Sequence, residues 1–153
     1  ERVLALSKAL NSAGFKAPVK SDIRTEIWVK LWGNAVFNPI SALTGATLRS
    51  ICTDPQTANL ARAAMAEVEQ VATAFGITMP VSLAKRLAGA AAVGEHKTSM
   101  LQDLEKGRPL ELDAVVGAVI ELADICGLAV PLLKGLYSLT RLRAATSLQT
   151  AKP

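Results

Sequence analysis

Apolar residues recur at spacings of three and four along most of the chain, which is the period of an α-helix. An exception is "FKAPVKSD" at residues 15–22, where apolar and polar residues roughly alternate, as in an edge strand that tolerates a proline. The sequence therefore predicts a helix and a strand followed by about seven helices, an all-α domain. The predicted helices cover residues 2–13, 23–37 with a continuation to 45, 47–53, 55–75, 81–93, 99–106, 110–126 and 132–145.

The ends of several helices carry recognisable signals. "VATAFGITMP" (71–80), "LADICGLAVP" (122–131) and, more loosely, "SAGFKAP" (12–18) place a glycine after a helix, then an apolar residue and a proline. This order predicts Schellman-type stops, in which the glycine is left-handed and the next apolar residue folds back. Asp22 and Asp54 precede helices as capping residues. Pro39 lacks an N–H, so we expect the second helix to kink or restart there.

Composition narrows the classes of protein. Half of the 153 residues are hydrophobic but only 4% are aromatic, which favours close-packed helices over a sheet sandwich. The net charge of +4 is spread along the chain without a basic run, so nucleic acid is not an expected partner, and an anionic small substrate suits the balance better. No apolar run approaches the ~20 residues of a membrane span and no signal peptide opens the chain, so we expect a cytoplasmic protein.

The cysteines and the histidine limit the chemistry further. Cys52 and Cys126 are isolated from each other, and we expect reduced, buried thiols rather than a disulfide. His96 is the single histidine and no cluster of metal ligands occurs, so no metal site is expected. Neither GxGxxG nor GxxxxGKS occurs, so this chain does not itself supply the usual phosphate cradle.

The segment "KLWGNAVFNP" (30–39) spaces Lys30, Asn34 and Asn38 four residues apart between bulky apolar residues. On a helix these three form one polar ribbon, because each step of four advances only about 40° around the axis. In one interpretation Lys30 reaches the surface and the asparagines bond neighbouring backbone. In the other, a buried Lys30 loses its hydration and serves as a proton donor beside two amides that grip substrate oxygens.

A second polar segment is "HKTSMLQDLEKGRPLELD" (96–113). Ser99 with Gln102 three residues later fits a capping box, and the same helix start could seat a carboxylate. Glu111 lies in the first turn of the next helix, where an acidic residue is stabilising without any function. Asp103 and Asp113 could be ordinary solvated charges.

Together these segments resemble a known family. "KLWGNAVFNPISALTG" (30–45), then "TSMLQDLEKGRPLELD" (98–113) and "GLAVP" (127–131), resemble the C-terminal domain of ketopantoate reductases (2-dehydropantoate 2-reductases). The resemblance covers nearly the whole chain. Its motif is a lysine with asparagines four and eight residues later, then a serine and a glutamate twelve apart.

The resemblance implies an organisation in domains. Residues 1–21 would be the end of an N-terminal Rossmann domain that binds NADPH, and residues 22–146 an all-α substrate and catalytic domain related to the C-terminal domain of 6-phosphogluconate dehydrogenases. Residues 147–153 would be a frayed tail. We expect the chain to belong to a longer protein and to be inactive alone, with a homodimer through the helical domain as a possible assembly.

The resemblance also implies roles in an NADPH-dependent reduction of ketopantoate, in pantothenate biosynthesis, or of another 2-keto acid. Lys30 would be the general acid, and Glu111 would hydrogen-bond the substrate hydroxyl. Asn34 and Asn38 would orient the substrate, Ser99 would bind its carboxylate, and Asp103 is a secondary candidate. The alternative is a non-catalytic helical module for dimerisation or interaction, in which the ribbon is structural.

Overall fold

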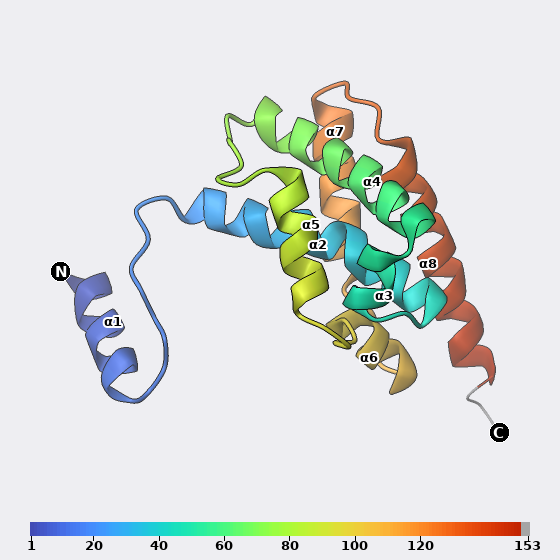
Figure 1. The fold of residues 1–153 in the computed structure, drawn as a ribbon. Helices are drawn as coiled ribbons and strands as arrows, with labels where there is room; N and C mark the ends of the chain where they lie inside the picture. Colours follow the sequence, from blue (N-terminus) through green and yellow to red (C-terminus); the bar gives the residue numbers. More distant parts are fainter. Residues whose placement is uncertain (151–153) are drawn as a thin grey trace.

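Helix α2 (Ile23–Thr44) runs through the middle of the molecule and packs against α4, α6 and α8 (Figure 1). The computed structural model describes residues 1–150, with side chains as far as residue 147. These residues contain no strand, so the expectation of an all-α fold is confirmed. The other elements are α1 (Arg2–Ser12), α3 (Leu48–Thr53), α4 (Pro55–Ala74), α5 (Leu83–Ala92), α6 (Ser99–Glu105), the π-helical segment η1 (Asp113–Gly117), α7 (Ala118–Ile125) and α8 (Pro131–Thr150).

Burial increases along α2, because only its second half is enclosed by other helices. Trp32 is completely buried, and its indole N–H donates to the carbonyl of Met65 in α4 at 2.8 Å. From Ala35 to Ala42 every residue of α2 is buried. By contrast, Ile23 and Ile27 are 61% and 57% exposed. The central helix is therefore a core element at one end and a surface element at the other.

Pro39 does not interrupt α2, so of the expected kink or restart the restart is wrong. The helix begins after Asp22, whose carboxylate accepts from the backbone N–H groups of Arg24 and Thr25. It continues across Pro39 to a left-handed Gly45. Pro39 and both its neighbours are buried, so packing of this turn offsets the backbone hydrogen bond that proline cannot make.

The three glycine stops have the expected geometry. Gly14, Gly76 and Gly127 all have positive φ, between 66° and 86°. In each, the residue after the glycine donates its N–H to the carbonyl five residues earlier: Phe15 to Leu10, Ile77 to Ala72 and Leu128 to Ala123. The predicted Schellman stops are confirmed as shared local structure.

The N-terminal segment differs from its prediction in one respect. Helix α1 forms and stands apart from the bundle (Figure 1), but residues 13–22 form turns and irregular chain instead of the predicted strand. A strand needs a neighbouring strand for its hydrogen bonds, and no described segment lies beside this one as a partner. The segment is held instead by α1, where Ser7 donates to the carbonyl of Ala17 at 2.5 Å.

The C-terminal helix is longer than predicted. α8 continues to Thr150, so the frayed tail expected from residue 147 is wrong for 147–150, and 151–153 lie outside the described residues. Its first turn is capped from another helix: Glu67 of α4 accepts the N–H groups of Leu132 and Leu133 at 3.0 and 2.9 Å. A carboxylate suits this end, where free N–H groups and the helix dipole are positive.

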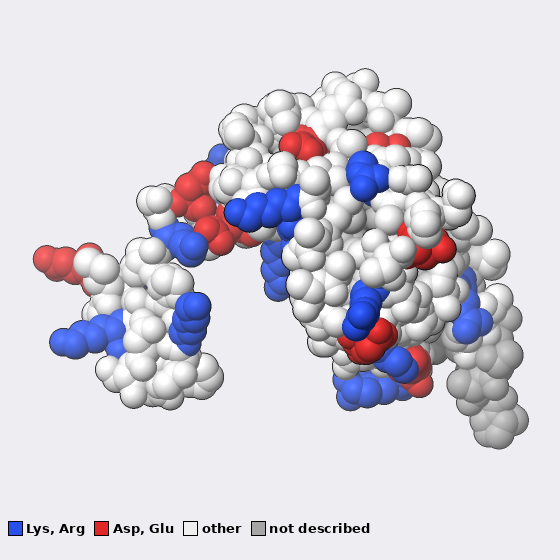
Figure 2. Space-filling model, in the orientation of Figure 1, with Lys and Arg blue, Asp and Glu red and all other residues white. Residues whose placement is uncertain are grey.

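The surface carries interspersed charges. Figure 2 shows basic and acidic side chains mixed over one face, without a broad basic patch on it. Among residues 1–150, no helix is both long and apolar enough to cross a bilayer. Cys52 and Cys126 are free thiols, as expected, although both are half-buried instead of fully buried.

Candidate functional site

The three residues of the polar ribbon lie in three different environments. Asn38 is only 6% exposed, Asn34 is half-buried and Lys30 is exposed. Of the two interpretations of the ribbon, the structure agrees with the one in which Lys30 reaches the surface, and the interpretation with a buried Lys30 is wrong. Lys30 is exposed because it lies in the first half of α2, before the helix enters the bundle.

Asn34 and Asn38 line a hollow of about 260 Å³ between α2, α5 and the start of α6, which we call the amide hollow. This volume is close to the lower end of the range for small-molecule pockets, roughly 300–1,000 Å³. Lys30 does not line it. The lining residues are Gly33, Asn34, Phe37, Asn38, Leu48, Arg86, Ala90, Val93, His96, Thr98 and Ser99.

Ser99 has a different local role from the one its sequence context predicted. The capping residue of α6 is Thr98, whose hydroxyl accepts from the N–H of Leu101 at 3.3 Å. Gln102 does not complete a capping box with Ser99 but donates to the carbonyl of Lys97. The Ser99 hydroxyl has no hydrogen-bond partner among the described side chains and backbone, so it remains available to a molecule in the hollow.

A second, much smaller hollow adjoins the amide hollow and shares Asn38 and Ser99 with it. We call it the acidic notch; its volume is about 10 Å³, and Asn38, Ser99, Met100, Asp103 and Glu111 line it. Asp103 has a partner, since Arg108 lies 3.7 Å from its carboxylate. Glu111 is exposed, and its carboxylate has no partner among the described residues.

The structure thus brings together five of the six candidate residues and leaves one apart. Asn34, Asn38 and Ser99 share the amide hollow, while Asn38, Ser99, Asp103 and Glu111 share the notch. Lys30 precedes Asn34 by one helical turn and lies outside both hollows. Two segments some 60 residues apart in sequence therefore form one continuous polar site.

Sequence reasoning missed Arg86 and His96, which also line the amide hollow. His96 had been considered only as a metal ligand. Arg86 lies on α5, outside both segments of the motif. One signal could have pointed to it: Gly33 sits in the interior of α2, where glycine costs about 1 kcal/mol relative to alanine and usually has a packing reason.

Near the amide hollow, one described side chain, Cys52, has a shifted pKa. Burial raises the pKa of the neighbouring Cys52 thiol, while the positive charge of Arg86 acts in the opposite direction. Cys52 is therefore mostly a thiol at neutral pH and is not an activated nucleophile. In residues 1–150 no three His, Cys, Asp or Glu side chains cluster as a metal site would require.

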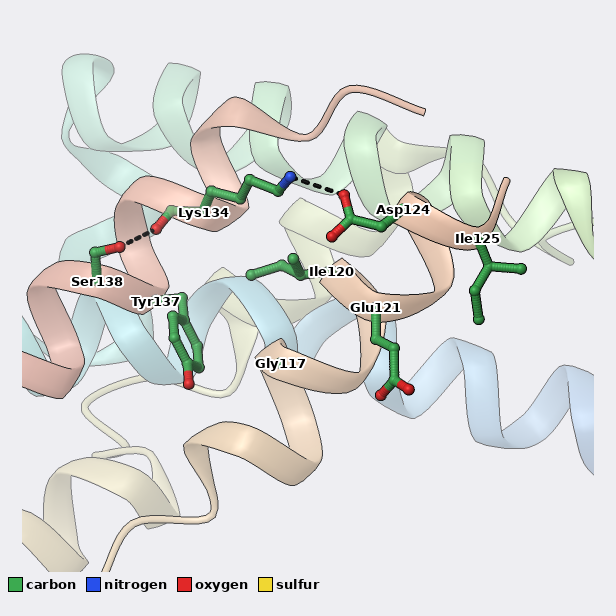
Figure 3. A pocket seen from close by; sticks show the side chains of 8 residues that line it. All are labelled: Gly117, Ile120, Glu121, Asp124, Ile125, Lys134, Tyr137 and Ser138. Atoms are coloured by element: carbon green, nitrogen blue, oxygen red, sulfur yellow. Dashed lines mark hydrogen bonds and ion pairs between the residues drawn. The ribbon is translucent and has the colours of Figure 1, made fainter. Parts of the chain in front are cut away.

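A larger hollow, about 670 Å³, lies elsewhere, between α7 and α8 (Figure 3). Its lysine is already paired, because Lys134 reaches Asp124 at 2.8 Å. The Tyr137 hydroxyl donates to Asp113 at 2.6 Å, and this bond to a carboxylate raises the pKa of Tyr137. None of the six candidate residues lines this hollow, so the amide hollow and the acidic notch are the candidate site.

The geometry defines a class of protein: an all-helical domain with a small polar site between its central helix, α2, and the short helix α6. The family model of the ketopantoate reductase PanE/ApbA C-terminal domain matches residues 22–144. The chain belongs to this family.

Individual relatives support the same assignment. The chain is 51% identical over 141 residues to a 2-dehydropantoate 2-reductase of Mesorhizobium japonicum, covering 92% of this chain and 43% of the relative. The crystal structure of 2-dehydropantoate 2-reductase from Methylococcus capsulatus superposes with a TM-score of 0.88 and 32% identity, covering 99% of this chain and 52% of that one. A dimeric ketopantoate reductase from Staphylococcus aureus matches with a TM-score of 0.70 and 27% identity, covering 84% and 46%. The chain spans about half the length of the curated relatives that it matches.

Proposed function

We propose that this chain is the substrate-binding and catalytic half of an NADPH-dependent 2-dehydropantoate 2-reductase or of a paralogue that reduces another 2-keto acid. The observation that carries the proposal is the continuous site in which Asn34, Asn38 and Ser99 adjoin Glu111. The close relatives with that activity support it.

The residues of this chain do not fit a dinucleotide, since the sequence contains no glycine-rich phosphate cradle. We therefore assign the cofactor to a nucleotide-binding domain, to which residues 1–21 would belong. Bound there, NADPH would supply a hydride to the ketone carbon of the substrate.

Each polar residue then has a physical role. Reduction of a ketone places negative charge on its oxygen, and an ammonium group stabilises that charge and can donate the proton. Lys30 is the candidate for this general acid, acting from the open side of the site. The amides of Asn34 and Asn38 would orient the substrate, Ser99 would contact its carboxylate and Glu111 would accept from its hydroxyl.

The exposure of Lys30 suits a site completed by a second domain. The apolar side chains around the start of α2 are also exposed, including Val19, Ile23 and Ile27. Covering this surface would bury apolar area and remove water from Lys30 at the same time. We propose that the nucleotide-binding domain provides this cover.

Lys30→Ala in the whole enzyme tests the proposal. Loss of a general acid should lower kcat for ketopantoate by about 10²- to 10⁴-fold. Lys85→Ala, which removes another exposed lysine, on α5, is the matched control and should leave kcat unchanged. The measurement is NADPH oxidation across a panel of 2-keto acids.

A non-catalytic interaction module predicts the opposite result. Lys30→Ala would then change stability or oligomeric state while leaving any activity intact. If the whole protein reduces no 2-keto acid, the proposed function is wrong.

A further inference from the structure

Arg86 is a cation without a partner at the wall of the amide hollow. Its Nε is buried and has no hydrogen-bond partner, and no ion pair or hydrogen bond joins the Arg86 side chain to any described residue. Arginine carries its charge at any physiological pH, and a buried donor without a hydrogen-bond partner is unfavourable. An unsatisfied guanidinium beside an open hollow points to an anion that is bound there in the working protein.

Gly33 makes room for this side chain. A Cβ built on Gly33 would lie 2.5 Å from Nη2 of Arg86 and 3.3 Å from its Cζ, so any larger residue would displace the guanidinium. The guanidinium therefore lies directly against the backbone of α2, next to Asn34 in sequence. This contact explains why α2 tolerates a glycine in its interior, and it fixes where the positive charge is presented.

The other groups of the hollow define the chemistry of the anion. No carboxylate lines the amide hollow; its remaining polar side chains are those of Asn34, Asn38, His96, Thr98 and Ser99. A guanidinium offers a planar fork of donors that matches a carboxylate with two parallel hydrogen bonds. The acidic side chains, Asp103 and Glu111, lie in the notch at the other side of Asn38 and Ser99.

We propose that Arg86, positioned by Gly33, binds the carboxylate of the substrate and thereby selects 2-keto acids over uncharged ketones. This inference rests on the proposed function for the identity of the substrate. The charged end of the substrate lies towards Arg86, and its hydroxyl end lies towards Asn38 and Glu111. Ser99, shared by the two hollows, contacts the same carboxylate from the start of α6.

The test compares equilibrium binding of ketopantoate and of its uncharged amide to the whole protein by calorimetry. Arg86→Met should raise the Kd of ketopantoate roughly 10- to 100-fold, the usual effect of losing a hydrogen-bonded charge partner, and should change the Kd of the amide less than about threefold. Arg62→Met, a change at an exposed arginine on α4, is the matched control and should alter neither.

Gly33→Ala provides a second variant that keeps the charge but moves it. It should weaken ketopantoate binding in the wild-type background and have no further effect, within about twofold, in the Arg86→Met background. Such coupling is expected only if both residues act through the same contact. If the two substitutions weaken binding independently, Gly33 does not position Arg86, and the proposal is contradicted.

Other outcomes separate this proposal from the proposed function. If wild-type protein binds ketopantoate through Arg86 but does not oxidise NADPH with it, the reductase assignment fails while the carboxylate site stands. If Arg86→Met leaves ketopantoate binding unchanged, weakens the amide equally, or instead weakens NADPH binding, the carboxylate site is overturned. Absence of ketopantoate binding by wild-type protein overturns it as well.

Discussion

Asp54 caps α4 through a carboxylate that accepts from both the backbone N–H and the hydroxyl of Thr57, at 2.8 and 3.0 Å. These hydrogen bonds favour the ionised form and lower the pKa of Asp54 below its usual 3.8. The contribution to stability is thus present above that value and is lost as the pH falls through the lower, folded-state pKa.

A pH series checks this role of Asp54. Asp54→Asn keeps a capping side chain without the charge, so the variant should differ from wild type at pH 7 and approach it between about pH 4 and pH 2. Thermal unfolding followed by circular dichroism measures the difference. A gap that stays constant over this range would show that ionisation of Asp54 does not matter.

Individual residues also mark where sequence reasoning reached its limit. The spacing of Lys30, Asn34 and Asn38 correctly put them on one helix, because helical period is a local property. Their burial was not predictable, since it depends on where other helices cross α2. The same holds for Arg86, whose long side chain reaches Gly33 from α5, a helix that packs on α3 and α4. Thr98, and not Ser99, caps α6. Both adjacent residues carry a hydroxyl that can cap a helix, so the sequence alone did not decide between them.

At the scale of elements, the contact between Glu67 and the start of α8 joins helices that are 65 residues apart in sequence. Glu67→Gln should lower the free energy of unfolding by about 1–2 kcal/mol, because neutral hydrogen bonds replace charge-assisted ones at a helix N-terminus. Glu69→Gln is the control on the same helix; its carboxylate has no partner among the described residues. Urea unfolding of the chain measures both, and equal effects would contradict the assigned role of Glu67.

Helix ends were the most predictable elements. Glycine stops and aspartate caps depend on a few adjacent residues, so their signals are complete within the sequence. Continuity of α2 across Pro39 was missed because packing around this turn, which is not local, decided it. The strand predicted at 15–22 failed for the same reason, since alternation alone supplies no neighbouring strand.

The whole molecule exposes apolar side chains at its N-terminal end. Val3, Leu4, Leu6 and Phe15 are between 61% and 65% exposed. Grouped apolar surface of this kind usually mediates association. The chain without a covering domain should therefore form dimers or larger species at micromolar concentration.

Light scattering tests this association. Leu6→Lys should shift the chain towards the monomer, and Leu142→Lys, at a similarly exposed position on α8, is the control for a separate surface. A strictly monomeric wild-type chain would contradict the prediction. If only Leu142→Lys dissociates it, association runs through the bundle and the prediction for the N-terminal end is wrong.

The π-helical segment η1 has a consequence for comparing related chains. A π turn accommodates one residue more than an α turn, and it lies between Glu111 and the regular α7. A relative with one residue fewer at this point could form a regular α turn there and keep both α7 and the residues before it in place. An alignment that puts its gap elsewhere would equate Glu111 with a side chain on a different face. In this family, a single misplaced gap is enough to hide an acidic residue of the site.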